Sequence, residues 1–259
     1  MKVVINQPTY LPWLGYFDLI DQANLFVVLD NVQFVKQSWQ QRNRIKTPTG
    51  LQWLTVPVQF RGRLGQVLLE VEIRDSAFAR DHLRAIELAY RRSPHFAGYY
   101  PALAAIIEKR SAGRLLDLNL DLIEWMIQKL EITTPMVRAS SLGLQGKRAE
   151  LLAGICERVG AEEYLSPVGS AGYLLEEHGA LTSRGIEVTF HNYEHPQYEQ
   201  LFGFFAPYTS LLDLLFNHGR DSLRILRSGR REAHSLTEMA AIQHSAGLGN
   251  EADPTVLAV

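Results

Sequence analysis

The 259-residue chain has little of several features that would assign a protein to a class at once. It has one cysteine, Cys156, so it cannot form an internal disulfide, which is typical of a reducing compartment. No run approaches the roughly 18 apolar residues of a membrane-spanning helix. The apolar stretch near the start ends at Pro8 and is too short for a signal peptide. We therefore expect a cytoplasmic protein that does not insert into a membrane.

The chain also lacks an excess of basic residues. Its 26 Lys and Arg residues are balanced by 28 Asp and Glu residues, which gives a formal net charge of −2. General nucleic-acid binders and proteins of anionic membrane surfaces normally carry a global basic excess. General nucleic-acid binding is therefore not expected, and any contact with an anion must be local.

Acidic residues are missing from one stretch in particular. Residues 31 to 63 contain six cationic side chains and no Asp or Glu. The six are Lys36, Arg42, Arg44, Lys46, Arg61 and Arg63. One surface ion pair is worth at most about 1 kcal/mol, whereas several converging Arg and Lys side chains can hold a phosphate or a carboxylate. The stretch predicts an anion site if these side chains converge, and a solvated hairpin if they point apart.

The first thirty residues have the pattern of a βαβ unit. Apolar runs at 2–6 and 25–30 predict buried strands, and residues 14–23 between them have apolar side chains at helical spacing. The two strands should be parallel, and open α/β sheets bind their ligands at the carboxyl ends of the strands. The candidate ligand-binding residues near these ends are Asn6, Gln7, Tyr10, Asp30, Asn31 and Gln33.

The rest of the chain continues the alternation. Further strands are predicted at 53–58, 67–73, 135–141, 162–166 and 185–193. Helices are predicted at 147–160 and 210–219, the second closed by Gly219 as a left-handed cap, and residues 167–181 are a loop that enters a helix. Residues 79–130 are mostly helical in pattern. We predict one α/β domain over residues 1–231, with a Rossmann-like, mostly parallel sheet flanked by helices and a helical insertion at about 79–130. Residues 232–259 are expected to form a poorly ordered or peripheral tail.

Two further features are candidate binding elements. The loop at 164–173 places Ser166, Gly169 and Ser170 between a predicted strand and a predicted helix, where backbone N–H groups suit an anion. The alternative is a tight turn that requires glycine. Trp39 lies among the cations and either stacks on a nucleobase or sugar or belongs to the core.

The candidate catalytic residues are Asp30 and His195. Asp30 follows a strand that ends at the ligand edge, and the imidazole of His195 titrates near neutrality. The spacing of His191 and His195 suits a metal only on a helix, and it falls in a loop, so no metal is expected. No cofactor is expected either. Asp18 and Asp21 flank the apolar face of the first helix and are expected to be solvated.

Several segments resemble one family of bacterial proteins. They are QPTYLPWLGYFDLI, FVVLDNVQFVKQSWQQRNRIKTPTGLQWLTVPV, DLNLDLIEWM, YLSPVGSAGYL, HPQYEQ and SLLDLLFNHG. Together they resemble the WbqC-like family over residues 3 to about 219. The resemblance implies a link to genes for O-antigen and other surface polysaccharides, and a glycine transfer to an amino sugar has been suggested for one member. The family pattern opens with His-Gln-Pro, whereas this chain has Asn6, which cannot exchange a proton near neutral pH.

The residues and the resemblance together suggest a transferase that moves an aminoacyl or acyl group to the amine of a nucleotide-activated sugar, a small anionic substrate. The expected roles are phosphate binding by Lys36, Arg42, Arg44 and Lys46, orientation of the sugar or carbonyl by Asn31, Gln33 and Asn43, and base catalysis by Asp30 or His195. One alternative is a nucleotide or nucleotide-sugar binding module without chemistry. Another is an interaction subunit of a biosynthetic complex.

Overall fold

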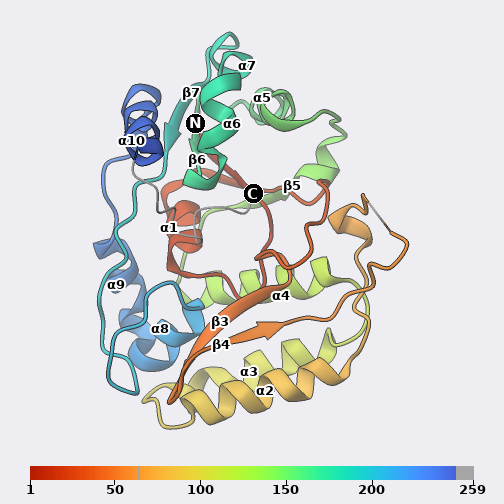
Figure 1. Ribbon diagram of the computed structural model, residues 1–259, viewed down its shortest axis with the longest axis vertical. Coiled ribbons are helices and arrows are strands. Elements are labelled where there is room, and N and C mark those ends of the chain that lie inside the picture. Colours follow the sequence, from red (N-terminus) through yellow and green to blue (C-terminus); the bar gives the residue numbers. More distant parts are fainter. Residues whose placement is uncertain (64, 249–259) are drawn as a thin grey trace.

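A six-stranded sheet forms the centre of the computed structural model, which describes residues 1–63 and 65–248 (Figure 1). The strand order is β5-β2-β1-β6-β7-β8, and all neighbours are parallel except β7 and β8. The strands are β1 (Lys2–Asn6), β2 (Leu25–Val28), β5 (Met136–Arg138), β6 (Glu163–Ser166), β7 (Glu187–Phe190) and β8 (His234–Ser235). The α/β class with a mostly parallel sheet flanked by helices, predicted from the sequence, is confirmed.

Helices cover both faces of this sheet because its strands are apolar on both sides. In β1, Val4 packs into one hydrophobic cluster and Val3 and Ile5 into another, as the two-residue period of a strand requires. The helices of the Val4 side are α1 (Leu14–Gln22), α4 (Leu115–Lys129), α8 (Leu211–His218) and α9 (Ser222–Ser228). Those of the other side are α5 (Arg148–Val159), α6 (Ala171–Glu177), α7 (Gly179–Thr182) and α10 (Leu236–Leu248).

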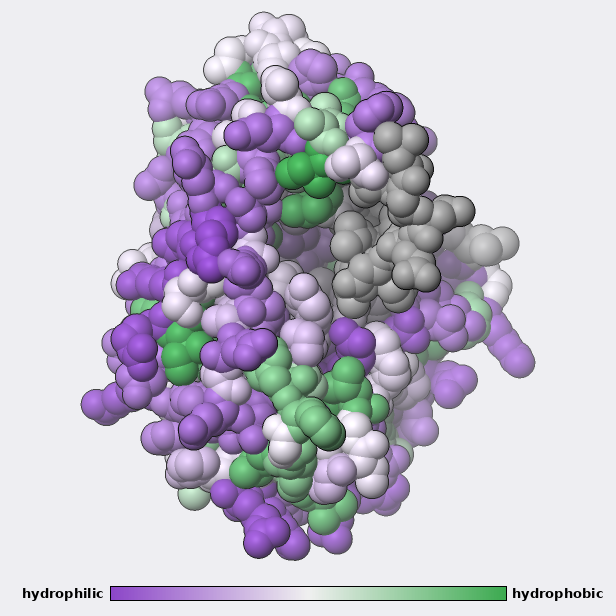
Figure 2. Space-filling view, turned by 60° about the vertical axis from the view of Figure 1, so that its left-hand side comes forward, coloured by the Kyte–Doolittle hydropathy of each residue, from purple (hydrophilic) through white to green (hydrophobic). Residues whose placement is uncertain are grey.

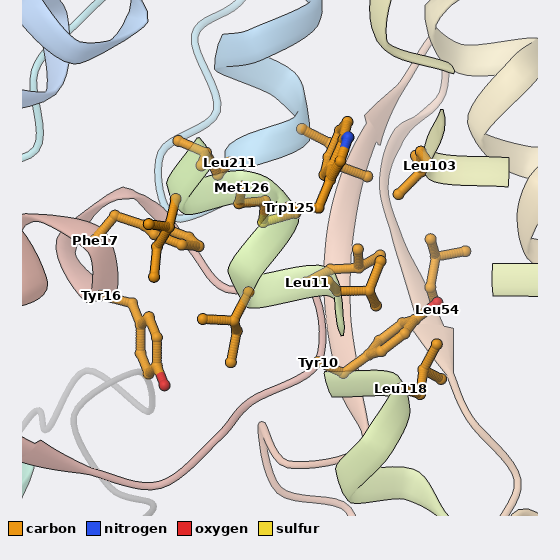
Figure 3. Close-up of a cluster of buried hydrophobic side chains, with 14 of the residues drawn as sticks. Tyr10, Leu11, Tyr16, Phe17, Leu54, Leu103, Leu118, Trp125, Met126 and Leu211 are labelled. Carbon is orange, nitrogen blue, oxygen red and sulfur yellow. The ribbon is translucent and has the colours of Figure 1, made fainter. Parts of the chain in front are cut away.

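A separate antiparallel hairpin packs on the hydrophobic cluster that contains Val4 and extends this cluster away from the sheet. It consists of β3 (Arg42–Thr47) and β4 (Gly50–Thr55), with α2 (Ala77–Tyr90) and α3 (Phe96–Lys109) packed beyond it (Figure 1). Leu11, Leu54, Leu103 and Leu118 meet between the hairpin and the helices (Figure 3). The helices α2, α3 and α4 occupy the region where the sequence predicted a helical insertion.

The predicted strand at 67–73 is wrong. The chain there forms a short 3-10 turn at Leu68–Glu70, and only isolated bridges join Val67 to Gln33 and Ile73 to Val58. Leu68 and Ile73 are buried, so the apolar pattern reports burial rather than a strand ladder. Residues 50–55 form β4, which pairs with β3 at residues 42–47. The strand β3 was not predicted from the sequence.

Gly219 ends α8 but is not a left-handed cap. Its φ of 55° is positive as predicted, whereas its ψ of −122° lies outside the αL region. A Cβ at this position would lie 2.6 Å from Nδ1 of His95. Glycine is therefore required both by the backbone angle and by the close approach of His95.

Residues 234–248 of the predicted tail form β8 and α10. The buried side chain of Met239 packs against the cluster that contains Val188 of β7. Residues 249–259 lie outside the described part of the chain. The face with α9 and α10 turned forward is mostly hydrophilic, with apolar residues gathered in its lower half (Figure 2). Within residues 1–63 and 65–248, no helix combines the length and apolarity needed to cross a membrane.

Candidate functional site

A cavity of about 350 Å³ lies at the carboxyl ends of β1, β6 and β7. The chain leaves β1 toward β2 on one side and later returns to β6 on the other, so the cavity lies where the strand order reverses. Open α/β sheets bind ligands at this position. The lining residues are Asn6, Gln7, Thr9, Trp13, Gly15, Tyr16, Leu19, Val35, Ser38, Trp39, Gln40, Asn43, Pro167, Val168, Gly169, His191, Tyr193 and Tyr208.

Aromatic rings form much of the cavity wall. The indole of Trp13 contacts Tyr193 and Tyr208 edge to face, with ring centroids 5.7 and 5.3 Å apart. Gly15 permits this arrangement, because a Cβ there would lie 2.2 Å from the Trp13 ring. Trp39 supplies a further ring from the segment before β3. Such walls suit the C–H faces of a sugar or the face of a base.

Amide side chains supply the polar groups of the cavity. The Oδ1 atom of Asn6 accepts the N–H of Gln7 at 2.8 Å, and Oε1 of Gln7 accepts Nε2 of Gln40. Asn43 donates to the carbonyl of Leu11 at 2.8 Å. Nδ2 of Asn6 makes no hydrogen bond to the residues described here, so it can donate to a ligand. These bonds hold the amides in fixed orientations before a ligand binds.

His191 and Asp18 form a buried pair at the cavity wall. Nε2 of His191 lies 2.8 Å from Oδ2 of Asp18, and the imidazole stacks on Tyr193 with centroids 5.5 Å apart. Asp18 is fully buried on α1 and accepts further hydrogen bonds from Arg230 at 2.9 Å and Gln22 at 2.6 Å. The carboxylate therefore has its charge compensated behind an imidazole that lines the cavity.

The expectation that Asp18 and Asp21 are solvated is wrong. Asp18 is fully buried, and the side chain of Asp21 is 6% exposed. Arg227 binds Asp21 through two nitrogens at 2.8 and 2.7 Å, and Arg230 bridges the two aspartates. The histidine and arginine partners of the two acids come from more than 170 residues away, so the local helical pattern gave no sign of them.

Asp30, a predicted base, lies at the end of β2 but does not line the cavity. It is fully buried and accepts from Nε of Arg138 at 2.6 Å and from the backbone N–H and hydroxyl of Ser140 at 2.9 and 2.8 Å. These bonds join the chain after β2 to the end of β5 and to the residues that follow it. The carboxylate is enclosed by the partners that neutralise it.

His195, the other predicted base, lies behind the cavity wall. Its ring stacks on Trp13 with centroids 6.1 Å apart, and Nδ1 lies 2.9 Å from the carbonyl of Pro196. Nε2 is buried without a hydrogen-bond partner among the described residues. Burial lowers the pKa of His195, which favours the neutral ring. Its role in catalysis stays a prediction.

Two of the six cations are brought together beside the cavity. Arg42 and Arg44 share one face of β3, and their guanidinium carbons lie 4.4 and 5.3 Å from the ring centroid of Trp53. Arg44 also lies 5.7 Å from the ring of Trp39, which lines the cavity, and the two indoles are 5.4 Å apart. Arg42, Arg44, Trp39 and Trp53 thus form an aromatic and cationic surface, named here the Trp-Arg surface.

The other predicted phosphate ligands lie elsewhere. Lys36 is exposed and places its ammonium 3.7 Å from the ring centroid of Phe60. Lys46 is buried at the far end of β3 and donates to the carbonyl of Phe204. Desolvation lowers the pKa of Lys46, and the charge of Asp213 opposes this effect. Lys46 therefore does not share the Trp-Arg surface.

The loop after β6 borders the cavity with Pro167, Val168 and Gly169. Gly169 lines it, whereas Ser166 and Ser170 are buried. The hydroxyl of Ser166 lies 3.1 Å from the carbonyl of Pro167. Of the three predicted anion-binding residues in this loop, Gly169 alone borders the cavity.

The remaining predicted binding residues lie outside the cavity wall. Tyr10 is fully buried, with its hydroxyl 2.8 Å from Nδ1 of His82. Asn31 is partly buried and Gln33 is exposed beyond β2. The predicted residues that the structure does bring together at the cavity are Asn6, Gln7, Trp39, Asn43 and Gly169. In the described part of the chain, no group of three or more His, Cys, Asp or Glu residues is placed to hold a metal ion.

Comparison with known proteins identifies the family. The model of the WbqC-like protein family matches residues 7–225. The chain belongs to the WbqC-like protein family. A Mycobacterium tuberculosis relative, named as the uncharacterized protein Rv1507c, is 38% identical over 231 residues, which cover 89% of this chain and 99% of the relative. No solved structure matches the chain significantly. Asn6, which precedes the matched residues, lines the cavity.

Sequence reasoning missed the His191 and Asp18 pair. His191 was considered only as a metal ligand, although it directly follows a strand that ends at the ligand edge. The same rule that selected Asn6 at the end of β1 selects His191 directly after β7. Asp18 had no comparable signal, because only the folded chain brings His191 and Arg230 to it.

Proposed function

We propose that this WbqC-like protein is a cytoplasmic transferase that moves an acyl or aminoacyl group, such as glycyl, to the amine of a nucleotide-activated amino sugar. The observation that carries the proposal is one continuous site, in which a cavity of amides and aromatic rings borders the Trp-Arg surface. The cavity suits the sugar of such a substrate, and the Trp-Arg surface suits its nucleotide. A surface-glycan role also fits the context implied by the family resemblance.

The sugar belongs in the cavity. A volume of about 350 Å³ lies at the lower end of the ~300 to 1,000 Å³ typical of small-molecule sites. Trp13 and Trp39 offer faces for the apolar side of a sugar ring, while Asn6 and Asn43 offer amides to its hydroxyl groups. The amine to be acylated would then lie at the inner wall formed by the ends of β6 and β7.

The nucleotide belongs on the Trp-Arg surface. Trp53 is 43% exposed, which leaves part of its ring for a base, and stacking on an aromatic ring is worth about 1 to 3 kcal/mol per base. No carboxylate among the described residues pairs with Arg42, so its guanidinium can bind a phosphate. Arg44 lies between Trp53 and Trp39 and joins the phosphate position to the cavity.

Calorimetric titration with uridine-diphosphate amino sugars, the free amino sugars and uridine diphosphate tests this proposal. We expect the complete nucleotide sugar to bind most tightly, and Arg42→Ala to weaken it at least tenfold, or about 1.4 kcal/mol. The matched control is Arg61→Ala, which removes an exposed cation of the same basic segment. The proposal is wrong if the nucleotide sugars do not bind, or if Arg42→Ala binds them as well as the unaltered protein.

Incubation with the bound sugar and an activated glycyl or acyl donor tests the chemistry. Mass spectrometry should detect an amide product whose mass has increased by the transferred group. Binding without product for thioester, ester and acyl-phosphate donors would instead support the alternative of a nucleotide-sugar binding module.

A further inference from the structure

We propose that His191 is the general base of the transfer and that Asp18 and Arg230 are its positioning residues. This inference rests on the function proposed above. It assigns the proton transfer to an imidazole at the end of β7, rather than to the two residues that the sequence suggested.

The backbone fixes His191 at the cavity. It is the first residue after β7, and its N–H donates to the carbonyl of Ser166 at the end of β6 at 2.8 Å. The cavity wall continues from this point into Pro167 and Gly169. His191 is thus placed by the sheet itself, which gives more precise positioning than a mobile loop.

Asp18 determines which nitrogen of His191 is available. The Asp18 carboxylate accepts from Nε2 at 2.8 Å, so the neutral imidazole carries its proton on Nε2 and its lone pair on Nδ1. Arg230 binds the second oxygen of Asp18 at 2.9 Å and holds the carboxylate in place. Nδ1 makes no hydrogen bond to a described residue and lies on the opposite side of the ring from Asp18.

Two tyrosines at the cavity are unsuited to the task. Desolvation by burial raises the pKa of Tyr16 and of Tyr193, so both hydroxyls keep their protons near neutrality. Asp30 does not reach the cavity and is enclosed by Arg138 and Ser140. An imidazole whose second nitrogen is held by a carboxylate is suited to accept a proton from an attacking amine.

The proposed reaction uses an activated acyl donor, such as a thioester or an ester. The amine nitrogen of the sugar attacks the acyl carbon, and the C–N bond forms as Nδ1 of His191 takes one proton from nitrogen. The bond between the acyl carbon and the sulfur or oxygen of the donor then breaks. The proton on His191 passes to that leaving group, which restores the neutral imidazole.

Nitrogen-15 NMR of histidine in the unliganded protein tests the geometry independently of any reaction. The His191 resonances, assigned by their loss in His191→Gln, should show the neutral tautomer with hydrogen on Nε2. Asp18→Asn should shift this signal toward a mixture of tautomers. A His191 ring protonated on Nδ1 in the unaltered protein would overturn the inference, even if the sugar binds and is acylated.

Steady-state kinetics test the role of His191 as a general base. The substrates are the donor and the amino sugar that give product in the incubation described above. His191→Gln retains an amide N–H near the position of Nε2 but lacks Nδ1, so kcat should fall about 100-fold or more with KM changed by no more than about threefold. Asp18→Asn should lower kcat less, and exposed His244→Gln should leave it unchanged. Full kcat in His191→Gln, or its loss in His195→Gln while His191→Gln remains active, would overturn the inference.

Folding of the variants is checked by circular dichroism and by calorimetric binding of the nucleotide sugar. If His191→Gln binds the sugar with the affinity of the unaltered protein but forms no product, the lost step is chemistry. If His191→Gln fails to fold, His191→Asn serves as the second variant, because its Oδ1 keeps an acceptor near Nδ1 that is too weak a base.

Discussion

Tyr10 and His82 form a buried pair in the core between the start of the chain and α2. The hydroxyl of Tyr10 lies 2.8 Å from Nδ1 of His82, and both residues are buried. Desolvation lowers the pKa of His82 from its ordinary value of 6.5 to about 4. This histidine therefore stays neutral in the folded protein at a pH at which an unfolded chain would protonate it.

The pair predicts a loss of stability in mild acid. The unfolded state binds a proton at His82 below about pH 6.5 and the folded state only below about pH 4, so stability is lost as the pH falls through this window. At about 1.4 kcal/mol for each tenfold change in proton affinity, His82 contributes a loss of about 3 kcal/mol. Urea unfolding measured from pH 7 to pH 4 should show that the free energy of unfolding of His82→Asn changes less with pH than that of the unaltered protein. Exposed His244→Asn should keep the original slope, and equal slopes in all three proteins would contradict the prediction.

At the scale of elements, the hairpin of β3 and β4 shows why some strands cannot be predicted from the sequence alone. β3 contains Arg42, Asn43, Arg44 and Lys46 and has few of the β-branched residues that announce a strand. Its register nevertheless places Arg44 opposite Trp53, with Ile45 directed to the core. The strand is stabilised by packing across the hairpin, a tertiary effect that local preference does not contain.

The end of α8 allows a matched test of glycine chemistry. Gly219→Ala adds a Cβ 2.6 Å from the His95 ring at a positive φ, so it should lower the free energy of unfolding by about 1 to 3 kcal/mol. Gly98→Ala on α3 adds a Cβ with no atom within 4 Å and should raise it by about 0.5 to 1 kcal/mol. Thermal and urea unfolding measure both. A Gly219→Ala variant as stable as Gly98→Ala would show that the α8 terminus tolerates a side chain.

Much of the fold follows from the sequence because its periodic segments are long and apolar. The parallel pair β1 and β2, the helical region at 79–130 and the later alternation were all predicted. The segment at 67–73 was misassigned, since its buried residues Leu68 and Val71 lie in and just after a 3-10 turn, and the chain there makes isolated bridges instead of a ladder. Apolar patterning reports which side chains are buried, but strand pairing also needs a partner in register.

The site was only partly predictable. The rule that ligands gather at strand carboxyl ends selected Asn6 and Gln7, and both line the cavity. It also selected Asp30, which the fold encloses with Arg138 instead. The pairing of Asp18 with His191 spans 173 positions, and no local property of either residue carries that information.

At the scale of the whole molecule, ion pairs fasten α1 to the segment that leads into β8. Asp18 and Asp21 on α1 bind Arg227 at the end of α9 and Arg230 beyond it. Asp18 is fully buried, so loss of its cationic partner leaves a carboxylate without water or compensating charge. Removal of one partner of a buried pair typically costs about 3 to 5 kcal/mol.

Arg230→Met should therefore lower the free energy of unfolding by about 3 kcal/mol. The matched control is Arg224→Met, whose pair with Asp221 at 3.5 Å is exposed on both sides and should contribute less than about 1 kcal/mol. Urea unfolding measures the two variants, and Asp18→Asn combined with Arg230→Met should recover part of the loss. Equal small losses in the two single variants would show that the buried network is not needed for stability.

The position of β1 in the middle of the sheet has a consequence for the order of folding. One neighbour, β2, follows within twenty residues, whereas the other, β6, begins at residue 163. During synthesis one edge of β1 therefore stays unpaired until more than half of the chain has left the ribosome. Pairing β1 with β6 closes a long loop, which slows folding. A nascent chain that stops before β6 has three of the six strands, an open edge on β1 and none of the cavity wall at the ends of β6 and β7, so until the late strands are made it exposes a strand edge that favours association with other chains.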